Sequence, residues 1–290
     1  MITPLSDPSL VDIAAISADL YLDSDGIWFA REVQPVSYPA QGSDQCFLIE
    51  DHSFWFQHRN QCIITAVQSY PPLAHGAIVD LGGGNGFGAK GLMQSGFNVV
   101  LLEPNPRAVR HAKTRGLTHI ICATLETAHI RPASLSAVGL FDVLEHVAAE
   151  VAYLQQLYAL LRPKAYLYVT VPAYSWLWSD EDNQAGHFRR YTLTQLSQAI
   201  TAAGFAVCFQ SYIFRFLPFP ALILRALPYR LGWRLPATSA TIARDHATHA
   251  GGRLTQILSK LLQPEISYLQ QQQPMLFGGS CLLIAQKPES

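Results

Sequence analysis

The sequence predicts an α/β fold in which a doubly wound, mostly parallel sheet carries helices on both of its faces. From residue 77 onward, apolar runs of strand length alternate with helical patterns, which is typical of a parallel sheet. The runs are apolar throughout instead of alternating with polar residues, as expected for strands buried on both faces. A chain of 290 residues accommodates one such domain with additions.

Seven apolar runs are expected to form strands. They lie at 77–81, 98–102, 118–122, 135–141, 165–171, 206–213 and 279–286, and helices are expected at 57–69, 87–95, 105–115, 148–161 and 193–203. Residues 1–56 would form an N-terminal arm or lid, and residues 57–290 the main domain. An insertion at about 214–275 would separate the last two strands.

The start of the insertion is apolar but contains three prolines within residues 212–228, so we do not expect one continuous helix there. Such a segment would cover the substrate site or form a homodimer contact. Attachment to a membrane surface is the alternative.

Residues 77–86 read Ala-Ile-Val-Asp-Leu-Gly-Gly-Gly-Asn-Gly, a short strand that ends in an acid and a glycine-rich turn. The next apolar run ends in Glu103, nineteen residues beyond Gly84. Glycines let the backbone approach a ligand closely, and the helix that follows points its free N–H groups back at that ligand. A carboxylate at the end of the second strand can accept both hydroxyls of a ribose. The pattern therefore predicts a nucleotide-binding half-fold.

Two kinds of nucleotide fit these glycines. Gly84-x-Gly86-x-x-Ala89 matches the looser dinucleotide fingerprint, which would indicate an NAD-dependent oxidoreductase. Asp80-x-Gly82-x-Gly84-x-Gly86, in contrast, resembles motif I of the class I S-adenosylmethionine-dependent methyltransferases. An acid just before the turn would repel a pyrophosphate but suits the ammonium group of a methionine moiety. Asp80 therefore favours S-adenosylmethionine.

Four further segments resemble the same superfamily, in particular its methyltransferase type 11/12-like branch. They are Ser53-Phe-Trp-Phe-Gln-His-Arg-Asn60, Val138-Gly-Leu-Phe-Asp-Val-Leu-Glu-His-Val147, Leu161-Arg-Pro-Lys-Ala-Tyr-Leu-Tyr-Val-Thr-Val-Pro172 and Gly186-His-Phe-Arg-Arg-Tyr-Thr192. Together they cover most of residues 50–210. One departure is that Lys164-Ala165 stands where the superfamily's turn has glycines.

The resemblance implies a Rossmann-like, seven-stranded sheet with one antiparallel strand, an N-terminal arm and a C-terminal insertion. It also implies methyl transfer from S-adenosylmethionine to O, N or C of a small-molecule or metabolite acceptor. Besides the oxidoreductase, the sequence leaves open a non-catalytic S-adenosylmethionine-binding module.

The cofactor residues follow from the resemblance. Asp80 and the backbone of Gly82, Gly83, Gly84 and Gly86 would hold the methionine end, and Glu103, followed by Pro104, the ribose; Phe141 and Asp142 would face the methionine part. The superfamily often has an acid after the third strand for the adenine amino group. Residues 122–127 have no Asp at that place, so adenine would rest on the backbone near Thr124 and Leu125, with Glu126 as a substitute.

Methyl transfer is an in-line displacement, and a base is needed only when the nucleophile arrives protonated. His146 and His187 are the titratable groups best placed to act as that base. For both, a purely structural role is the alternative. No metal is expected, because no His and Cys set has convincing ligand spacing.

The residues expected to bind the acceptor are polar or aromatic and lie in the matching segments or just after the third of them: His58, Asn60, Tyr174, Trp176, Arg190 and Tyr191. Aromatic residues that follow the fifth strand would line a pocket for something flat or apolar, because such folds place ligand-facing loops at the carboxyl ends of strands. Packing against the insertion is the alternative for Tyr174 and Trp176.

Composition limits the kinds of partner and the cellular location that the sequence predicts. The net charge of −1 gives no reason to expect a nucleic acid. Five well-separated cysteines without a C-x-x-C pair indicate reduced thiols, as in a cytoplasmic protein. The N-terminus lacks the pattern of a signal peptide, and no run reaches the length of a membrane span.

Overall fold

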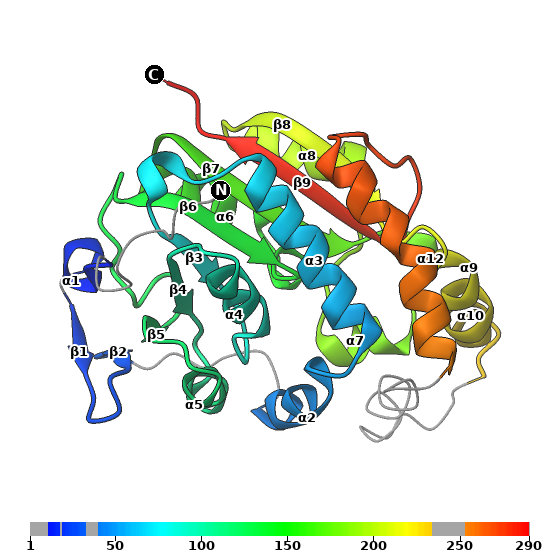
Figure 1. The fold of residues 1–290 in the computed structure, drawn as a ribbon, viewed down its shortest axis with the longest axis horizontal. Coiled ribbons are helices and arrows are strands. Elements are labelled where there is room, and N and C mark those ends of the chain that lie inside the picture. The colour runs from blue at the N-terminus through cyan, green and yellow to red at the C-terminus, as the bar shows by residue number, and fades with distance from the viewer. Residues whose placement is uncertain (1–10, 18, 33–39, 234–252, 290) are drawn as a thin grey trace.

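A nine-stranded sheet with the order β1-β2-β5-β4-β3-β6-β7-β9-β8 forms the centre of the computed structural model, which describes residues 11–17, 19–32, 40–233 and 253–289 (Figure 1). The strands are β1 Leu20–Leu22, β2 Trp28–Ala30, β3 Ile78–Leu81, β4 Val99–Leu102, β5 Ile120–Cys122, β6 Leu135–Phe141, β7 Leu161–Pro172, β8 Ala206–Ile213 and β9 Ser280–Gln286. The helices are α1 Ile13–Ile16, α2 Ala40–Glu50, α3 Phe54–Ser69, α4 Phe87–Gln94, α5 Pro106–Thr114, α6 Glu150–Leu160, α7 Asp180–Ala185, α8 Leu193–Ala202, α9 Pro218–Ala221, α10 Leu227–Arg230 and α12 Arg253–Gln270. Shorter helical turns are η2 Leu73–His75, η3 Leu144–His146, η4 Ser175–Leu177 and the π-helical turn η5 Leu222–Ala226.

All seven expected strands form, as β3 to β9. The expected total of seven strands is wrong, because the sheet has nine. The N-terminal arm adds β1 and β2 at the edge, where β2 pairs parallel to β5 and β1 antiparallel to β2. Both β1 and β9 therefore run against the parallel strands. The added strands have three residues each, too few to show a strand periodicity in the sequence.

Strand β3 lies at the middle of the parallel part, between β4 and β6. The chain crosses from β3 to one neighbour and later returns to the other side, so the order of strands reverses there. Ligands of open α/β sheets bind at the carboxyl ends of the strands at such a reversal. The loops after β3, β4 and β6 meet at this point, where a ligand site is therefore expected.

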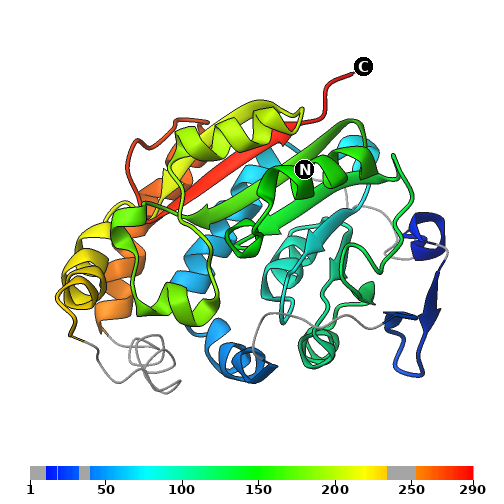
Figure 2. The same ribbon diagram turned by 180° about the vertical axis from the view of Figure 1, so that it is seen from behind.

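Helices cover both faces, as expected. The α3, α4, α5 and α12 helices pack on one face, with α3 and α12 side by side (Figure 1). Helices α6 and α8 cover the other face (Figure 2). On β3, Ile78 belongs to the first layer and Val79 to the second, so both faces of the strand are apolar.

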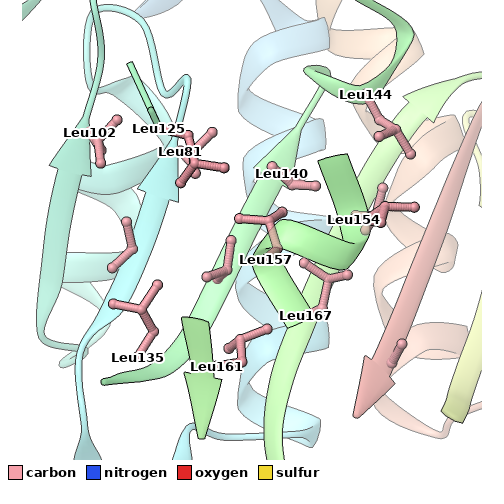
Figure 3. Packing of buried hydrophobic residues seen from close by; sticks show 14 of the residues in the cluster. Leu81, Leu102, Leu125, Leu135, Leu140, Leu144, Leu154, Leu157, Leu161 and Leu167 are labelled. Carbon is pink, nitrogen blue, oxygen red and sulfur yellow. The ribbon is translucent and has the colours of Figure 1, made fainter. Parts of the chain in front are cut away.

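Leucines dominate the layer between the sheet and α6 (Figure 3). Leu154 and Leu157 of α6 are fully buried, as are Leu140 of β6 and Leu167 of β7. This apolar layer keeps β3 and β6 adjacent, and with them the loops that build the site.

The first residues of β7 contain the expected departure from glycine. Lys164 adopts a left-handed φ of 64°, a conformation that glycine adopts without strain. Strand β7 begins at Leu161, earlier than expected, and its pairing with β6 shifts register between Leu135 and Ala137.

Helices α2, α7, α9, α10 and α12 were not expected as such. Pro218 and Pro220 lie in the first turn of α9, and Pro228 follows the π-helical turn. Segment 212–228 is therefore not one helix, because it begins as the end of β8 and continues as a turn before α9. Residues 234–252 of the expected insertion lie outside the described residues. Among the helices of the described part, none has the length and apolarity needed to cross a membrane.

Candidate functional site

The glycine-rich turn leads from β3 into α4. Gly82, Gly84 and Gly86 have left-handed φ values of 71°, 55° and 73°. A Cβ on Gly83 would lie 2.4 Å from Asp80 Oδ2, whereas a Cβ on Gly84 would meet nothing within 4 Å. The turn thus packs tightly against the Asp80 side chain at Gly83, whereas the space beside Gly84 holds no protein atom within that distance. The N-cap residue of α4, Gly86, makes no side-chain cap bond, and the Ala89 amide of the first turn donates to the Asp80 carboxylate.

Asp80 lies buried beneath this turn, with 1% of its surface exposed. No described residue donates a hydrogen bond to its Oδ1. Burial raises the pKa of Asp80 to about 7, although the nearby Arg59 charge acts in the opposite direction. A buried carboxylate with an unpaired oxygen beside an open glycine turn fits the ammonium group of the methionine moiety.

Glu103 follows β4 and reaches the same turn. The Gly84 amide donates to Glu103 Oε2 at 3.0 Å, and the Asn105 amide donates to Oε1 at 2.8 Å. Burial raises the pKa of Glu103, and these two hydrogen bonds oppose the shift. A carboxylate oxygen has the capacity for two hydrogen bonds. Each Glu103 oxygen uses one of them, so each can also accept one ribose hydroxyl. Pro104 continues the turn, and its carbonyl accepts from Cys122 Sγ at 3.8 Å.

Arg59 of α3 forms an ion pair at the end of β6. Its Nε lies 2.6 Å from Asp142 Oδ2, and Asp142 Oδ1 accepts from the Thr170 hydroxyl at 2.9 Å. Asp142 has a left-handed φ of 58°, so its backbone turns sharply out of the sheet. Phe141, one residue earlier, packs its ring against Gly139 in the core.

The expected adenine contact lies in the turn after β5. The Thr124 amide donates to the Thr127 hydroxyl at 3.0 Å, and the Thr127 amide donates back at 3.2 Å. The Thr124 amide is therefore already bonded. Leu125 is buried in the apolar layer, and Glu126 is exposed at the surface.

His146 and His187 come together after β6, with ring centroids 4.7 Å apart. The pKa of His146 is lowered to about 4, mainly by burial and then by His187. Glu145 is 1% exposed, and burial followed by the neighbouring Asp142 raises its pKa. Within the described residues, Glu145 Oε2 has no hydrogen-bond partner.

Asp182, at the start of α7, binds and orients the side chains of His187 and Arg190. Its Oδ1 lies 2.8 Å from His187 Nδ1, and its two oxygens receive Arg190 Nε at 2.7 Å and Nη2 at 2.9 Å. These partners outweigh burial and keep the pKa of Asp182 below its usual range. The charge of Arg190, expected to meet an acceptor, is thus paired within the protein.

Tyr191 and Tyr174 lie beside β7. Tyr191 is 3% exposed, and burial raises its pKa to about 12. Tyr174 stacks on Trp176 at 5.2 Å, on Tyr212 at 5.1 Å and on Phe277 at 5.5 Å between ring centroids. The expected aromatic residues therefore form one stack that joins the loop after β7 to β8 and the segment before β9.

His58 and Asn60 leave α3 in different directions from Arg59. His58 is buried, and its Nε2 lies 3.0 Å from Glu265 Oε2 of α12. Asn60 packs against Gly91 of α4 and donates to the Phe87 carbonyl at 3.5 Å. Neither residue has a described contact with His146 or His187.

The N-terminal arm docks on the glycine-rich turn through α2. Asn85 Nδ2 donates to the Ser43 carbonyl at 2.9 Å and to Glu50 Oε1 at 3.2 Å, and its Oδ1 accepts from the Ser43 hydroxyl at 2.7 Å. Arg115 donates to Glu50 Oε2 at 2.5 Å, to Asp51 Oδ2 at 3.1 Å and to the Asn85 carbonyl at 3.2 Å. The arm therefore lies against the glycine-rich turn.

The site residues expected from the sequence do not include Arg59, Asn85, Glu145 or Asp182. Two local signals were available: Glu145 is a second acid in the segment that holds Asp142 and His146, and Ser179-x-x-Asp182 is a capping box at the start of α7. The partners of Arg59 and Asn85 lie far away in the sequence, so no local pattern indicates them.

Known proteins resemble this chain in sequence and in fold. The model of a methyltransferase domain family matches residues 55–208. A probable S-adenosylmethionine-dependent methyltransferase of Mycolicibacterium smegmatis is 23% identical over 180 residues, which is 60% of this chain and 67% of that protein.

Two solved structures share the fold. Phosphoethanolamine N-methyltransferase 2 of Haemonchus contortus, solved with S-adenosyl-L-methionine, has a TM-score of 0.52 at 16% identity, over 88% of this chain and 58% of that chain. The 4+2 cyclase SpnF has a TM-score of 0.54 at 15% identity, over 89% of this chain and 100% of that chain.

Proposed function

Because this chain belongs to the methyltransferase domain family and is an S-adenosylmethionine-dependent methyltransferase, we propose that it methylates O, N or C of a small-molecule or metabolite acceptor bound beside Asp142, His146 and His187. The observation that supports this arrangement best is the hydrogen bond of 3.0 Å from the Gly84 amide to Glu103. It brings the ribose-binding carboxylate onto the same turn that Asp80 supports from beneath.

S-adenosylmethionine supplies a methyl group on a positively charged sulfur. Asp80 would hold the ammonium end, Glu103 the ribose hydroxyls, and the turn around Gly84 would approach the ligand closely because no side chain intervenes. Arg59 keeps Asp142 in place from the α3 side. These residues bind and orient, which is most of what an in-line displacement requires.

The acceptor side is lined by polar groups after β6 and aromatic groups after β7. The stack of Tyr174 and Trp176 suits a flat or apolar part of an acceptor. A base role for His146 or His187 stays a prediction. A lowered pKa makes His146 a weak proton acceptor, whereas Asp182 orients His187 so that Nε2 is the nitrogen with an available lone pair.

The first experiment is calorimetric titration with S-adenosylhomocysteine, with NAD as the parallel ligand. We expect micromolar binding of S-adenosylhomocysteine and no binding of NAD. Binding of NAD alone would contradict the proposed role of Asp80 and favour an oxidoreductase.

Turnover requires a second measurement, because one solved neighbour of the same fold is named as a cyclase. The chain is incubated with S-adenosylmethionine and a panel of small hydroxyl, amine and carbon-acid acceptors, and release of S-adenosylhomocysteine is followed. Release that depends on one acceptor class supports the proposal. Cofactor binding without release on any class would favour a non-catalytic S-adenosylmethionine-binding module.

A further inference from the structure

We propose that Glu145, His146 and His187 bind a divalent first-row transition-metal ion at the carboxyl edge of the sheet. Each residue offers one ligand atom, and the three atoms lie within 4.8 Å of one another. Two imidazole nitrogens and one carboxylate oxygen form a donor set that proteins use for zinc and for non-haem iron. The sequence hides this set because His187 lies far from the Glu145–His146 pair.

Both histidines are held as metal-bound histidines usually are, with the second ring nitrogen bonded to an acceptor. His187 Nδ1 is bonded to Asp182 at 2.8 Å. His146 has backbone hydrogen bonds with Ala185 and Gly186, the two residues that directly precede His187. In His187, this leaves Nε2 with a lone pair for a metal ion.

Glu145 provides a second and independent observation. Its side chain is 1% exposed, and no described residue donates a hydrogen bond to Oε2. A buried carboxylate oxygen without a partner is costly and rare. The two nearby arginines are engaged elsewhere, Arg59 with Asp142 and Arg190 with Asp182. A bound cation would satisfy the Glu145 oxygen.

Three protein ligands leave coordination positions open, as in catalytic metal sites. An oxygen of the acceptor, from a hydroxyl or a carboxylate, is the chemistry that fits such a position. A metal ion there would replace the base role expected for His146 and His187, because it lowers the pKa of a bound hydroxyl.

A second set of possible ligands shows the contrast. His58, Cys62 and Glu265 also lie close together, but all three are buried. The Glu265 oxygens accept from the Phe214 amide at 2.8 Å and the Arg215 amide at 2.7 Å. This set is therefore satisfied by the protein itself and serves as the internal control.

The test is titration of the full chain, without an affinity tag and after chelator treatment, with Co²⁺. Calorimetry gives the stoichiometry, and the visible absorption spectrum shows the ligands. We expect about one Co²⁺ per chain and no thiolate-to-metal band, since the proposed ligands contain no sulfur. Glu145→Gln and His146→Ala should each weaken Co²⁺ binding by roughly tenfold or more. Cys62→Ala should leave Co²⁺ binding at the wild-type level.

No binding of Co²⁺ to the wild-type chain would overturn the metal site. So would a thiolate band, or undiminished binding by both Glu145→Gln and His146→Ala. Circular dichroism establishes that the variants fold, and Glu145→Gln keeps the size and shape of the side chain. The proposal does not rest on methyl transfer, because S-adenosylhomocysteine binding is measured separately on the metal-free chain.

Discussion

At the scale of single residues, Asp80 and Glu103 end neighbouring strands, and burial raises the pKa of both carboxyls. Their hydrogen bonds differ. Glu103 accepts from two backbone amides, whereas Asp80 Oδ1 has no partner among the described residues. Glu103 therefore suits hydroxyl donors, and Asp80 needs a cation. S-adenosylmethionine offers both, because it carries ribose hydroxyls and an ammonium group.

Asp80 should make stability depend on pH. The carboxyl of an unfolded Asp titrates near ~3.9, but burial raises the pKa of Asp80 to about 7 in the fold. The folded chain then holds the proton more tightly, so its free energy of unfolding decreases as pH rises between these two values. The decrease from this one group is on the order of 4 kcal/mol.

Urea unfolding of wild type and Asp80→Asn measures this effect. The variant stays neutral, so the two proteins should have similar stability near about pH 4, and the variant should be the more stable one above about pH 7. The variant should also lose affinity for S-adenosylhomocysteine. A stability difference that stays constant with pH would contradict the assignment of this pKa to Asp80.

Glu103→Ala removes a charged hydrogen-bond acceptor from the proposed ribose site. We expect S-adenosylhomocysteine binding to weaken by about 1.5–3 kcal/mol, as measured by calorimetry. Glu289→Ala, at an exposed carboxylate paired with Lys164, is the control and should bind as wild type does. An unchanged affinity in Glu103→Ala would rule out the ribose assignment.

At the scale of elements, a buried network of hydrogen bonds and ion pairs holds α2 to the glycine-rich turn. Glu50 accepts from both Asn85 and Arg115, and the Arg115 guanidinium lies 4.6 Å from the centre of the Phe47 ring. Asn85 belongs to the glycine-rich turn itself. The lid role expected of residues 1–56 stays a prediction, but these contacts couple α2 to the turn that would bind the cofactor.

Glu50→Ala should release α2 from this network. Arg115 keeps Asp51 as a partner, so we expect a loss of about 1–3 kcal/mol. Chymotrypsin should then cleave faster after Phe47, whose ring otherwise stacks on His111 at 4.2 Å. Asp44→Ala, on the same helix, removes only an exposed pair with Arg107 and is the matched control. Equal cleavage rates in the two variants would show that the network does not hold α2.

The helical turns after β8 expose a row of apolar side chains. Phe219, Ile223, Leu224 and Leu227 are all exposed there. The substrate cover, homodimer contact and membrane attachment expected for this segment therefore stay predictions.

At the scale of the whole molecule, α12 joins the C-terminal part of the chain to α3 and to the end of β8. Glu265 links all three, because it accepts from the amides of Phe214 and Arg215 and lies 3.0 Å from His58 Nε2. Apolar packing of Leu262 and Ile266 completes the contact. His58 and Glu265 are 207 positions apart in the sequence, so this contact closes a long stretch of chain.

Glu265→Ala should destabilise the fold strongly. It leaves two backbone amides and the His58 ring without their acceptor, and we expect a loss of about 2–5 kcal/mol in urea unfolding. Gln263→Ala, at an exposed position of the same helix, should change stability by less than about 0.5 kcal/mol. A loss of similar size in both variants would contradict the role of Glu265.

The sequence by itself determined the parts of this protein that depend on local patterns. The seven core strands, the glycine-rich turn, and the acids Asp80 and Glu103 all follow from apolar runs and from residues next to them in the chain. The tertiary structure decided what depends on distant pairs. The strands β1 and β2, the Arg59–Asp142 pair, the partners of Asn85, and the approach of His187 to Glu145 come from contacts between separate elements. Periodicity and spacing describe one segment at a time, so no local signal specifies which segment packs against another.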